Sequence, residues 1–284
     1  MLLSALAYAK VNLYLKVLGK RDDGLHDLDM VMQSVSLADK VSVDTDCDGI
    51  RVACDGIADD DNIVTAAAKA YFRRAEIADG RAAFVIEKNI PVLAGLGGGS
   101  ADTAAALRLL NRMYNCLNED ELLKLAGEIG SDVPFCMTGG TARVKGFGEK
   151  ISPIENRLDY RLVLVKAGEK KSTGHMFGLI DSSDEHIGVS ADDLAECIRR
   201  GDRRASEFMQ NDFAKLWHEP RFDTAFSRLN DSGADTVCLS GSGPTVFALF
   251  YDKETSEQCF NTIKNDYPQS YLCAPVSHGV KIIE

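Results

Sequence analysis

A run of glycines between a predicted strand and a predicted helix constrains this chain more than any other feature. Residues 89–115 read NIPVLAGLGGGSADTAAALRLLNRMYN and pass from a strand edge, through the glycines, into an alanine- and leucine-rich helix. Successive glycine N–H groups can turn inward around phosphate oxygens, and a helix start adds unpaired N–H donors. Four glycines in the five residues 95–99 would be a costly way to build a plain turn or a close helix–sheet contact. We therefore predict a phosphate-binding loop.

Two better-known glycine motifs do not fit this segment. A Walker A loop ends in Gly-Lys-Ser/Thr, whereas Gly99 is followed by Ser100 and Ala101. The dinucleotide fingerprint G-x-G-x-x-G fails as well, because Ser100 occupies its last glycine position. We predict that Ser100 caps the helix, where its hydroxyl could serve the helix, a phosphate or a metal ion.

The composition narrows the class of protein. The 284 residues are 45% hydrophobic and 26% charged, as in a soluble globular enzyme with one large or two moderate domains. A net charge of −11 argues against a protein whose main function is to bind nucleic acid. We predict no membrane-spanning helix and no secretion signal, because no long apolar run occurs and MLLSALAYAK lacks a leading charged region.

The eight cysteines fit the same picture. None forms a CxxC pair or stands at zinc-finger spacing from a histidine, and several lie in apolar runs such as VPFCM and DTVCLS. We interpret them as reduced packing residues in the cytoplasm and not as a disulfide scaffold.

Strand and helix patterns suggest two units. Strands are predicted at 6–18, 31–37, 41–43, 50–53, 82–88, 160–167 and 270–276, with a hairpin at 139–151 and two strand segments around a glycine turn at 236–250. Helices are predicted at 62–75 with Asp61 or Asn62 as cap, at 119–130 opened by Asn118 or Glu119 and closed by left-handed Gly130, and at 191–202, 222–230 and 255–266. The strand and helix pattern restarts near residue 155, so we predict closely packed domains at 1–155 and 156–284.

Several segments together resemble the GHMP kinase superfamily over nearly the whole chain. They are PVLAGLGGGSADTAAAL, AYAKVNLYLKVLGKRDDGLHDL, GSDVPF, QNDF and LSGSGPTVFALF. The resemblance implies an α+β, two-domain fold, with a ribosomal-protein-like N-terminal α/β domain and a ferredoxin-like C-terminal domain. The N-terminal block and DVPF select the branch that uses ATP to phosphorylate the 2-hydroxyl of a cytidine diphosphate alcohol in non-mevalonate isoprenoid precursor biosynthesis.

The resemblance also implies roles for three polar residues. Asp132 in SDVPF matches the family's catalytic aspartate, which accepts or polarises the proton of the substrate hydroxyl. Lys10 matches a lysine that holds this aspartate ionised, and Asn12 matches a substrate-contacting asparagine on the same strand face. The residues alone leave two alternatives open, because Asp132 could be a helix cap and Lys10 a solvent-facing strand lysine.

Further site residues follow from the same resemblance. The nucleotide loop comprises Pro91, Ala94, Gly95, Leu96, Gly97, Gly98, Gly99, Ser100 and Ala101, and the Gly241–Gly243 turn approaches it. His26 matches the residue that recognises the cytosine base, and Phe177 matches an aromatic platform for that base. The family's tyrosine before the histidine is Leu25 here, which offers apolar contact without stacking. Thr173 matches a substrate contact, although a loop or capping role fits it nearly as well.

The implied cofactors and partners are those of a small-molecule kinase. ATP chemistry implies Mg²⁺, which we expect on phosphate oxygens, water and Ser100, because no pair of carboxylate ligands is visible. The acidic runs DDDN and 44–48 lack the spacing of a calcium loop and are assigned to solvated surface. A monomer or homodimer without nucleic-acid or membrane partners is expected.

Three alternative functions are open at this point. Another GHMP kinase, acting on a mevalonate- or homoserine-type alcohol, is compatible with Leu25. A non-catalytic nucleotide-binding relative is disfavoured by Lys10, Asp132 and the glycine loop together. An RNA-binding protein is disfavoured by the net charge of −11.

Overall fold

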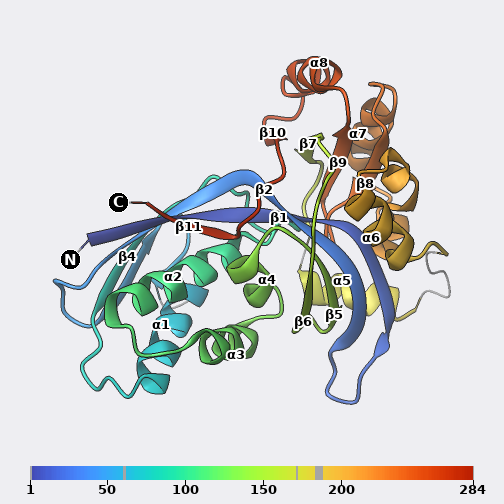
Figure 1. The fold of residues 1–284 in the computed structure, drawn as a ribbon. Helices are drawn as coiled ribbons and strands as arrows, with labels where there is room; N and C mark the ends of the chain where they lie inside the picture. The colour runs from blue at the N-terminus through green and yellow to red at the C-terminus, as the bar shows by residue number, and fades with distance from the viewer. Residues whose placement is uncertain (1, 60–61, 171, 183–187, 284) are drawn as a thin grey trace.

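The computed structural model describes residues 2–59, 62–170, 172–182 and 188–283. Within these ranges, the strands form two sheets (Figure 1). The first sheet consists of β1 (Leu2–Lys20), β2 (His26–Asp44), β3 (Ile50–Cys54), β4 (Ala82–Glu87), β5 (Thr141–Gly146), β6 (Lys150–Ile154) and β11 (Val280–Ile283). The second consists of β7 (Arg161–Lys166), β8 (Thr236–Leu239), β9 (Thr245–Phe250) and β10 (Ser270–Cys273).

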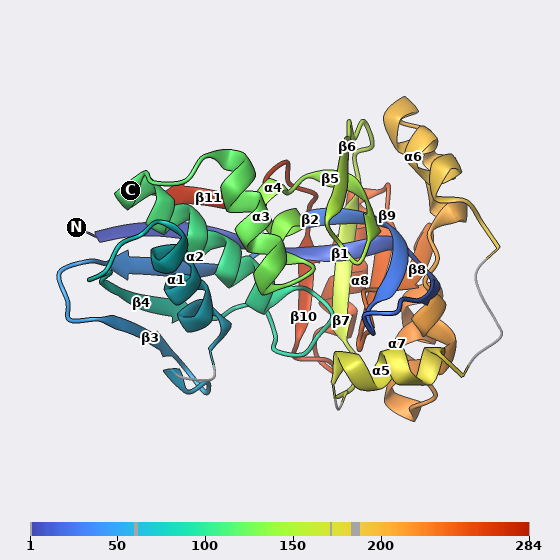
Figure 2. The same ribbon diagram turned by 90° about the horizontal axis from the view of Figure 1, so that it is seen from below.

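The helices divide between the two sheets in the same way. The first sheet carries α1 (Ile63–Arg74), α2 (Gly98–Tyr114), α3 (Glu119–Ile129) and α4 (Val133–Thr138) on one side (Figure 2). The second half contains α5 (Thr173–Ile180), α6 (Ala191–Arg200), α7 (Pro220–Asn230) and α8 (Lys253–Ile263). The second sheet has the order β10-β7-β9-β8 with antiparallel neighbours, which is the ferredoxin-like arrangement. This agrees with the expected two-domain α+β fold.

The long antiparallel pair β1 and β2 connects the two halves. Every residue from Ala7 to Leu15 in β1 is buried, so the predicted half-buried alternation is wrong for this stretch. The reason is that Val11 and Leu13 belong to one hydrophobic core, together with α2, while Leu15 and Val17 belong to the other, together with β7 and β9. The polar residues Lys10 and Asn12 are buried as well, because the backbone at Gly97 and Gly241 lies against their side chains.

Several predictions about element boundaries need correction. The strands predicted at 31–37 and 41–43 are one strand, β2, because its backbone pairs with β1 through Asp39 and Lys40. The strand β11 was not predicted; it pairs with β1 and returns the chain to the first sheet. The domain division at residue 155 stays a prediction.

The helix caps are partly as expected. Asn62 caps α1 by accepting from the Val64 N–H, and Asp61 lies outside the described residues. Asn118 forms a capping box with Glu121 at the start of α3, but Gly130 closes that helix with extended angles (φ −171°, ψ 147°) and not left-handed ones. The cap of α2 is Gly97 at φ 71°, so Ser100 lies inside the first turn and does not cap the helix.

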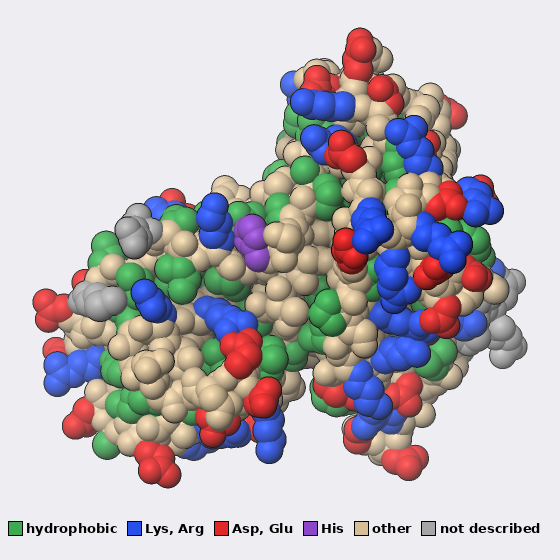
Figure 3. Space-filling model, viewed as in Figure 1, with side chains coloured by type: hydrophobic (Ala, Val, Ile, Leu, Met, Phe, Trp, Pro, Cys, Tyr) green, Lys and Arg blue, Asp and Glu red, His purple; other side chains and the backbone are tan. Residues whose placement is uncertain are grey.

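The surface carries charges of both signs. Figure 3 shows lysines and arginines gathered over the second half of the molecule, interleaved with acidic side chains. Ion pairs account for much of this mixture, such as Arg199 and Arg200 with Glu196, and Arg204 with Asp202. Among the helices of the described ranges, none has the length and apolar character needed to cross a membrane.

Candidate active site

The glycine loop, strand β1 and the turn between β8 and β9 meet at one place. The Lys10 N–H donates to the Leu96 carbonyl at 2.9 Å, which ties β1 to the loop. The Ser240 hydroxyl donates to the Gly95 carbonyl at 3.0 Å, and the Thr245 N–H donates to the Ala94 carbonyl at 3.2 Å. Segments far apart in the sequence are thus joined by two backbone hydrogen bonds and one from a side-chain hydroxyl, which fixes the loop's shape before any ligand binds.

A cavity of about 620 Å³ opens at this junction. Twelve of the predicted site residues line it: Lys10, Asn12, Pro91, Ala94, Gly95, Gly97, Gly98, Gly99, Ser100, Asp132, Thr173 and Phe177. Leu96 and Ala101 are buried in the core beneath the loop. Leu25 and His26 do not line the cavity. The structure therefore brings the predicted nucleotide and catalytic residues together with Thr173 and Phe177, and leaves Leu25 and His26 outside the lining.

Two of the loop glycines are required by the backbone. Gly95 and Gly97 have φ values of 80° and 71°, where a side chain is strained. A Cβ on Gly97 would lie 2.9 Å from Lys10 Cγ, and one on Gly95 would clash with the Ser240 carbonyl oxygen. Gly98 and Gly99 instead begin α2, so their N–H groups belong to the unpaired donors at the helix start. The loop thus lets Lys10 pass closely and directs donors into the cavity.

Lys10, Asn12 and Asp132 form a polar cluster in this cavity. The Lys10 ammonium donates to Asn12 Oδ1 at 2.7 Å and lies 3.3 Å from Asp132 Oδ2. Lys10 is 5% exposed, which rules out a strand lysine in solvent. Asp132 occupies the cap position of α4, but its side chain makes no capping hydrogen bond. Both structural alternatives left open by the residues are therefore wrong, and the carboxylate is held beside a buried cation.

A second charged group, which was not predicted, lies next to the loop. The Lys88 ammonium is 2.5 Å from Asp39 Oδ2 and 2.7 Å from Asp102 Oδ2. Asp102 Oδ1 is buried without a hydrogen-bond partner, and Asp102 and Lys88 both line the cavity. Burial raises the pKa of the Asp102 carboxyl, and the nearby Lys88 opposes the shift. One cation thus sits between two buried carboxyl groups.

Lys170, which was not predicted, also lines the cavity, and so does Ser242 of the turn that was expected to approach the glycine loop. Lys170 follows β7 in a polar EKK run and donates to the Ser242 hydroxyl at 2.8 Å. Burial, with the charge of Lys10 adding, lowers the pKa of Lys170 to about 8. A lysine run after a buried strand is an ordinary surface pattern, so no local signal distinguishes this residue.

The predicted base-binding residues form a separate arrangement. His26 Nε2 lies 2.6 Å from Asp181 Oδ1, and the His26 ring stacks on Phe177 with centroids 4.6 Å apart. Hydrogen bonding to His26, then to Lys20, lowers the pKa of Asp181. The face of Phe177 toward His26 is therefore covered by protein.

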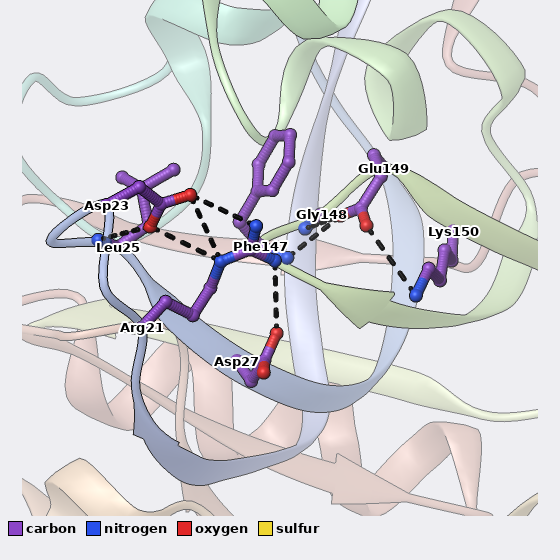
Figure 4. Close-up of polar contacts among 8 residues, drawn as sticks. All are labelled: Arg21, Asp23, Leu25, Asp27, Phe147, Gly148, Glu149 and Lys150. Atoms are coloured by element: carbon purple, nitrogen blue, oxygen red, sulfur yellow. Dashed lines mark hydrogen bonds and ion pairs between the residues drawn. The ribbon is translucent and has the colours of Figure 1, made fainter.

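Leu25 lies at the turn between β1 and β2 (Figure 4). Its N–H donates to Asp23 Oδ1 at 3.1 Å, and its side chain is 47% exposed. Arg21 pairs with Asp23 and Asp27, and its guanidinium lies 5.6 Å from the centre of the Phe147 ring. The turn that presents Leu25 is thus held by ion pairs and by the neighbouring β5–β6 turn.

The groups that line the cavity suit two chemical tasks. Helix-start and loop N–H groups, with the three lysines Lys10, Lys88 and Lys170, suit a polyphosphate. A carboxylate beside a buried ammonium, in the same cavity, suits acceptance of a proton from an alcohol. Among the described residues there is no group of three or more His, Cys, Asp or Glu that would hold a metal ion by itself.

Comparison with known proteins agrees with this site. The family model described as "GHMP kinases N terminal domain" matches residues 62–140, and that described as "GHMP kinases C terminal" matches 195–269. A protein of Clostridium botulinum named 4-diphosphocytidyl-2-C-methyl-D-erythritol kinase is 36% identical over 276 residues, covering 94% of this chain and 97% of its own. A protein of the same name from Bacillus cytotoxicus is 38% identical over 274 residues, covering 93% and 94%.

A solved structure gives the same result. A crystal structure of 4-(cytidine 5'-diphospho)-2C-methyl-D-erythritol kinase superposes with a TM-score of 0.81 at 27% identity, covering 96% of this chain and 98% of that one. Sequence, fold and site geometry therefore agree over almost the whole chain. The chain belongs to the GHMP kinase family, and within it to the 4-diphosphocytidyl-2-C-methyl-D-erythritol kinases.

Proposed function

We propose that this small-molecule kinase transfers the γ-phosphoryl group of ATP to the 2-hydroxyl of 4-diphosphocytidyl-2-C-methyl-D-erythritol, a step of non-mevalonate isoprenoid precursor biosynthesis. The observation that carries the proposal is that the Lys10–Asp132 pair and the glycine loop face one cavity. The names of the Clostridium and Bacillus relatives support the choice of alcohol.

The mechanism follows from what phosphoryl transfer requires. The reaction needs an aligned nucleophile, neutralised charge on the moving phosphoryl group and an acceptor for the hydroxyl proton. Asp132 accepts the proton, because its carboxylate faces the cavity and pairs with the Lys10 ammonium at 3.3 Å. Lys10 also stabilises the charge that develops on the attacking oxygen. Asn12 fixes the position of Lys10 and contacts the substrate. Thr173, at the start of α5, also contacts the substrate.

Magnesium fits this cavity as a partner of the nucleotide. Mg²⁺ prefers oxygen ligands and keeps several waters. The Ser100 hydroxyl and the unpartnered Asp102 Oδ1 offer such oxygens in the cavity, beside the loop that would hold the phosphates. When bound, the ion would neutralise charge on the phosphate oxygens.

A substrate panel tests the proposed function. We expect ADP release to be stimulated by the cytidine diphosphate alcohol far more strongly than by homoserine or phosphomevalonate, because the cavity margin carries the His26–Phe177 pair. Coupled measurement of ADP with each alcohol, at fixed ATP and Mg²⁺, checks this. Preference for either of the other alcohols would assign the chain to a different activity of the same family.

The base-binding margin leads to a second prediction. We propose that the cytosine base lies near Leu25, His26 and Phe177. Leu25→Tyr should lower the KM for the cytidine diphosphate alcohol roughly 3- to 10-fold, since stacking of an aromatic ring on a base contributes about 1 kcal/mol or more. Initial rates over a range of alcohol concentrations measure the effect. The KM for ATP should stay unchanged, and an unchanged KM for the alcohol would remove Leu25 from the base site.

The setting of the reaction is part of the proposal. We place it in the cytoplasm, in keeping with eight cysteines that are all free in the described ranges. The loop, Lys10, Asp132 and Phe177 come from one chain, so a monomer is sufficient for the site and a homodimer is compatible with it. Neither nucleic acid nor a membrane is needed as a partner.

A further inference from the structure

Lys170 is a half-buried cation that the mechanism above does not use. It lines the active-site cavity and donates to the Ser242 hydroxyl at 2.8 Å. The described residues place no carboxylate within ion-pair distance of its ammonium. The adjacent Glu169 pairs instead with Lys166, at 2.7 Å. Within the described ranges, Lys170 therefore forms no direct ion pair.

The charged groups that face Lys170 make this arrangement more unusual. Lys10 from β1 disfavours the charged form of Lys170. Asp132, at the start of α4, favours the charged form, with a smaller effect than that of Lys10. Burial is the largest influence and, together with Lys10, lowers the pKa of Lys170 to about 8. A half-buried cation beside another cation is unfavourable in the free protein, and an anion entering between them would relieve the cost.

Lys10 and Lys170 lie beside two consecutive residues of the Gly241–Gly243 turn. A Cβ on Gly241 would lie 3.4 Å from Lys10 Nζ, and the next residue, Ser242, binds Lys170. The same turn is held against the glycine loop, because a Cβ on Gly241 would also lie 3.0 Å from the Gly95 carbonyl oxygen. Both ammonium groups therefore flank the space between the loop and Asp132.

We propose that Lys170 binds the γ-phosphoryl group of ATP and neutralises its charge during transfer, acting together with Lys10. The proposal rests on the proposed kinase function, because the γ-phosphoryl group must lie between the loop and Asp132 to reach the alcohol. It assigns the second half of the chain a direct part in the transfer. Lys170 therefore contributes to the binding of ATP and not to that of ADP, since ADP has no phosphoryl group in this position.

Nucleotide binding without the alcohol gives the first test. Titration calorimetry at fixed Mg²⁺ compares ADP with a non-hydrolysable ATP analogue. For Lys170→Met we expect a 10- to 100-fold loss of affinity for the analogue, as for a lost charge-assisted hydrogen bond, and less than a 3-fold change for ADP. The control Lys253→Met removes an exposed lysine of α8, paired only loosely with Glu257 at 4.0 Å, and should change neither affinity. Equal losses for both nucleotides, or none, would overturn the proposal.

A pH series gives the second test and remains informative if Lys170→Met does not fold. The affinity of the natural protein for the analogue should fall as the pH rises through about 8, because Lys170 then loses its proton. Lys170→Arg keeps its charge over this range, so it should lack that decline. A decline that persists in Lys170→Arg contradicts the proposal. A protein that passes both tests but does not phosphorylate the cytidine diphosphate alcohol would contradict the proposed function and leave the role of Lys170 intact.

Discussion

Asp132→Asn is expected to lower kcat by about 10³-fold while the affinity for ATP stays within a factor of three. Proton transfer to a positioned group contributes roughly 10² to 10⁴ in rate, and the amide cannot accept the proton. The fold should survive, because the Asp132 side chain makes no capping hydrogen bond and Lys10 keeps its bond to Asn12. Single-turnover rates, with calorimetric titration of ATP, separate the two effects.

The control for this variant is a carboxylate without a role in the cavity. Asp159 is 94% exposed in its side chain and pairs with Arg161 at 3.2 Å, so Asp159→Asn should leave kcat and ATP affinity unchanged. Near-normal turnover in Asp132→Asn would remove it as the proton acceptor. A loss of ATP affinity as large as the loss of kcat would show that the residue acts on the nucleotide instead.

Gly97→Ala is expected to weaken ATP binding by at least about 10-fold and to affect alcohol binding much less. A side chain at φ 71° costs about 1–2 kcal/mol, and the new Cβ would lie 2.9 Å from Lys10 Cγ. Either the loop or Lys10 has to move, and both face the phosphates. Separate titrations with a non-hydrolysable ATP analogue and with the alcohol measure the difference.

Gly99→Ala is the matched control within the same loop. Gly99 lies in α2, and the nearest atom to a Cβ there is Ile63 Cγ2 at 3.8 Å, so alanine meets no strain or protein clash. It should stabilise the fold slightly, by up to about 1 kcal/mol, as alanine does in helices. Equal losses of ATP and alcohol binding in Gly97→Ala would contradict a loop dedicated to the nucleotide.

Local sequence patterns predicted the parts of the site that depend on neighbouring residues. The glycine loop needs two positive-φ positions followed by a helix, and both requirements are visible in consecutive residues. Asn62 and Asn118 were found as caps for the same reason, since a cap acts on an N–H two or three residues away. Resemblance to the family then related Lys10 to Asp132, a pairing that no local pattern contains.

The residues that were missed depend on contacts between distant segments. Lys88 and Asp39 are 49 positions apart, and Lys170 and Ser242 are 72 apart. Asp39 also explains why β2 was divided in two: a charged residue suggests a break in a strand, but pairing with Lys88 allows it to be buried there. The four-residue strand β11 is too short for a periodic signal and exists because β1 offers it a free edge.

The continuous strands β1 and β2 also limit how this kinase can move. Each of these strands runs for 19 residues, and together they contribute to both hydrophobic cores, so the two halves share paired strands and are not joined by a flexible linker. A hinge between the halves would have to break the ladder between β1 and β2 or expose core side chains. We therefore expect substrate capture to rely on rotations of individual side chains, such as Phe177 leaving His26, and on loop adjustments, and not on closure of one lobe over the other.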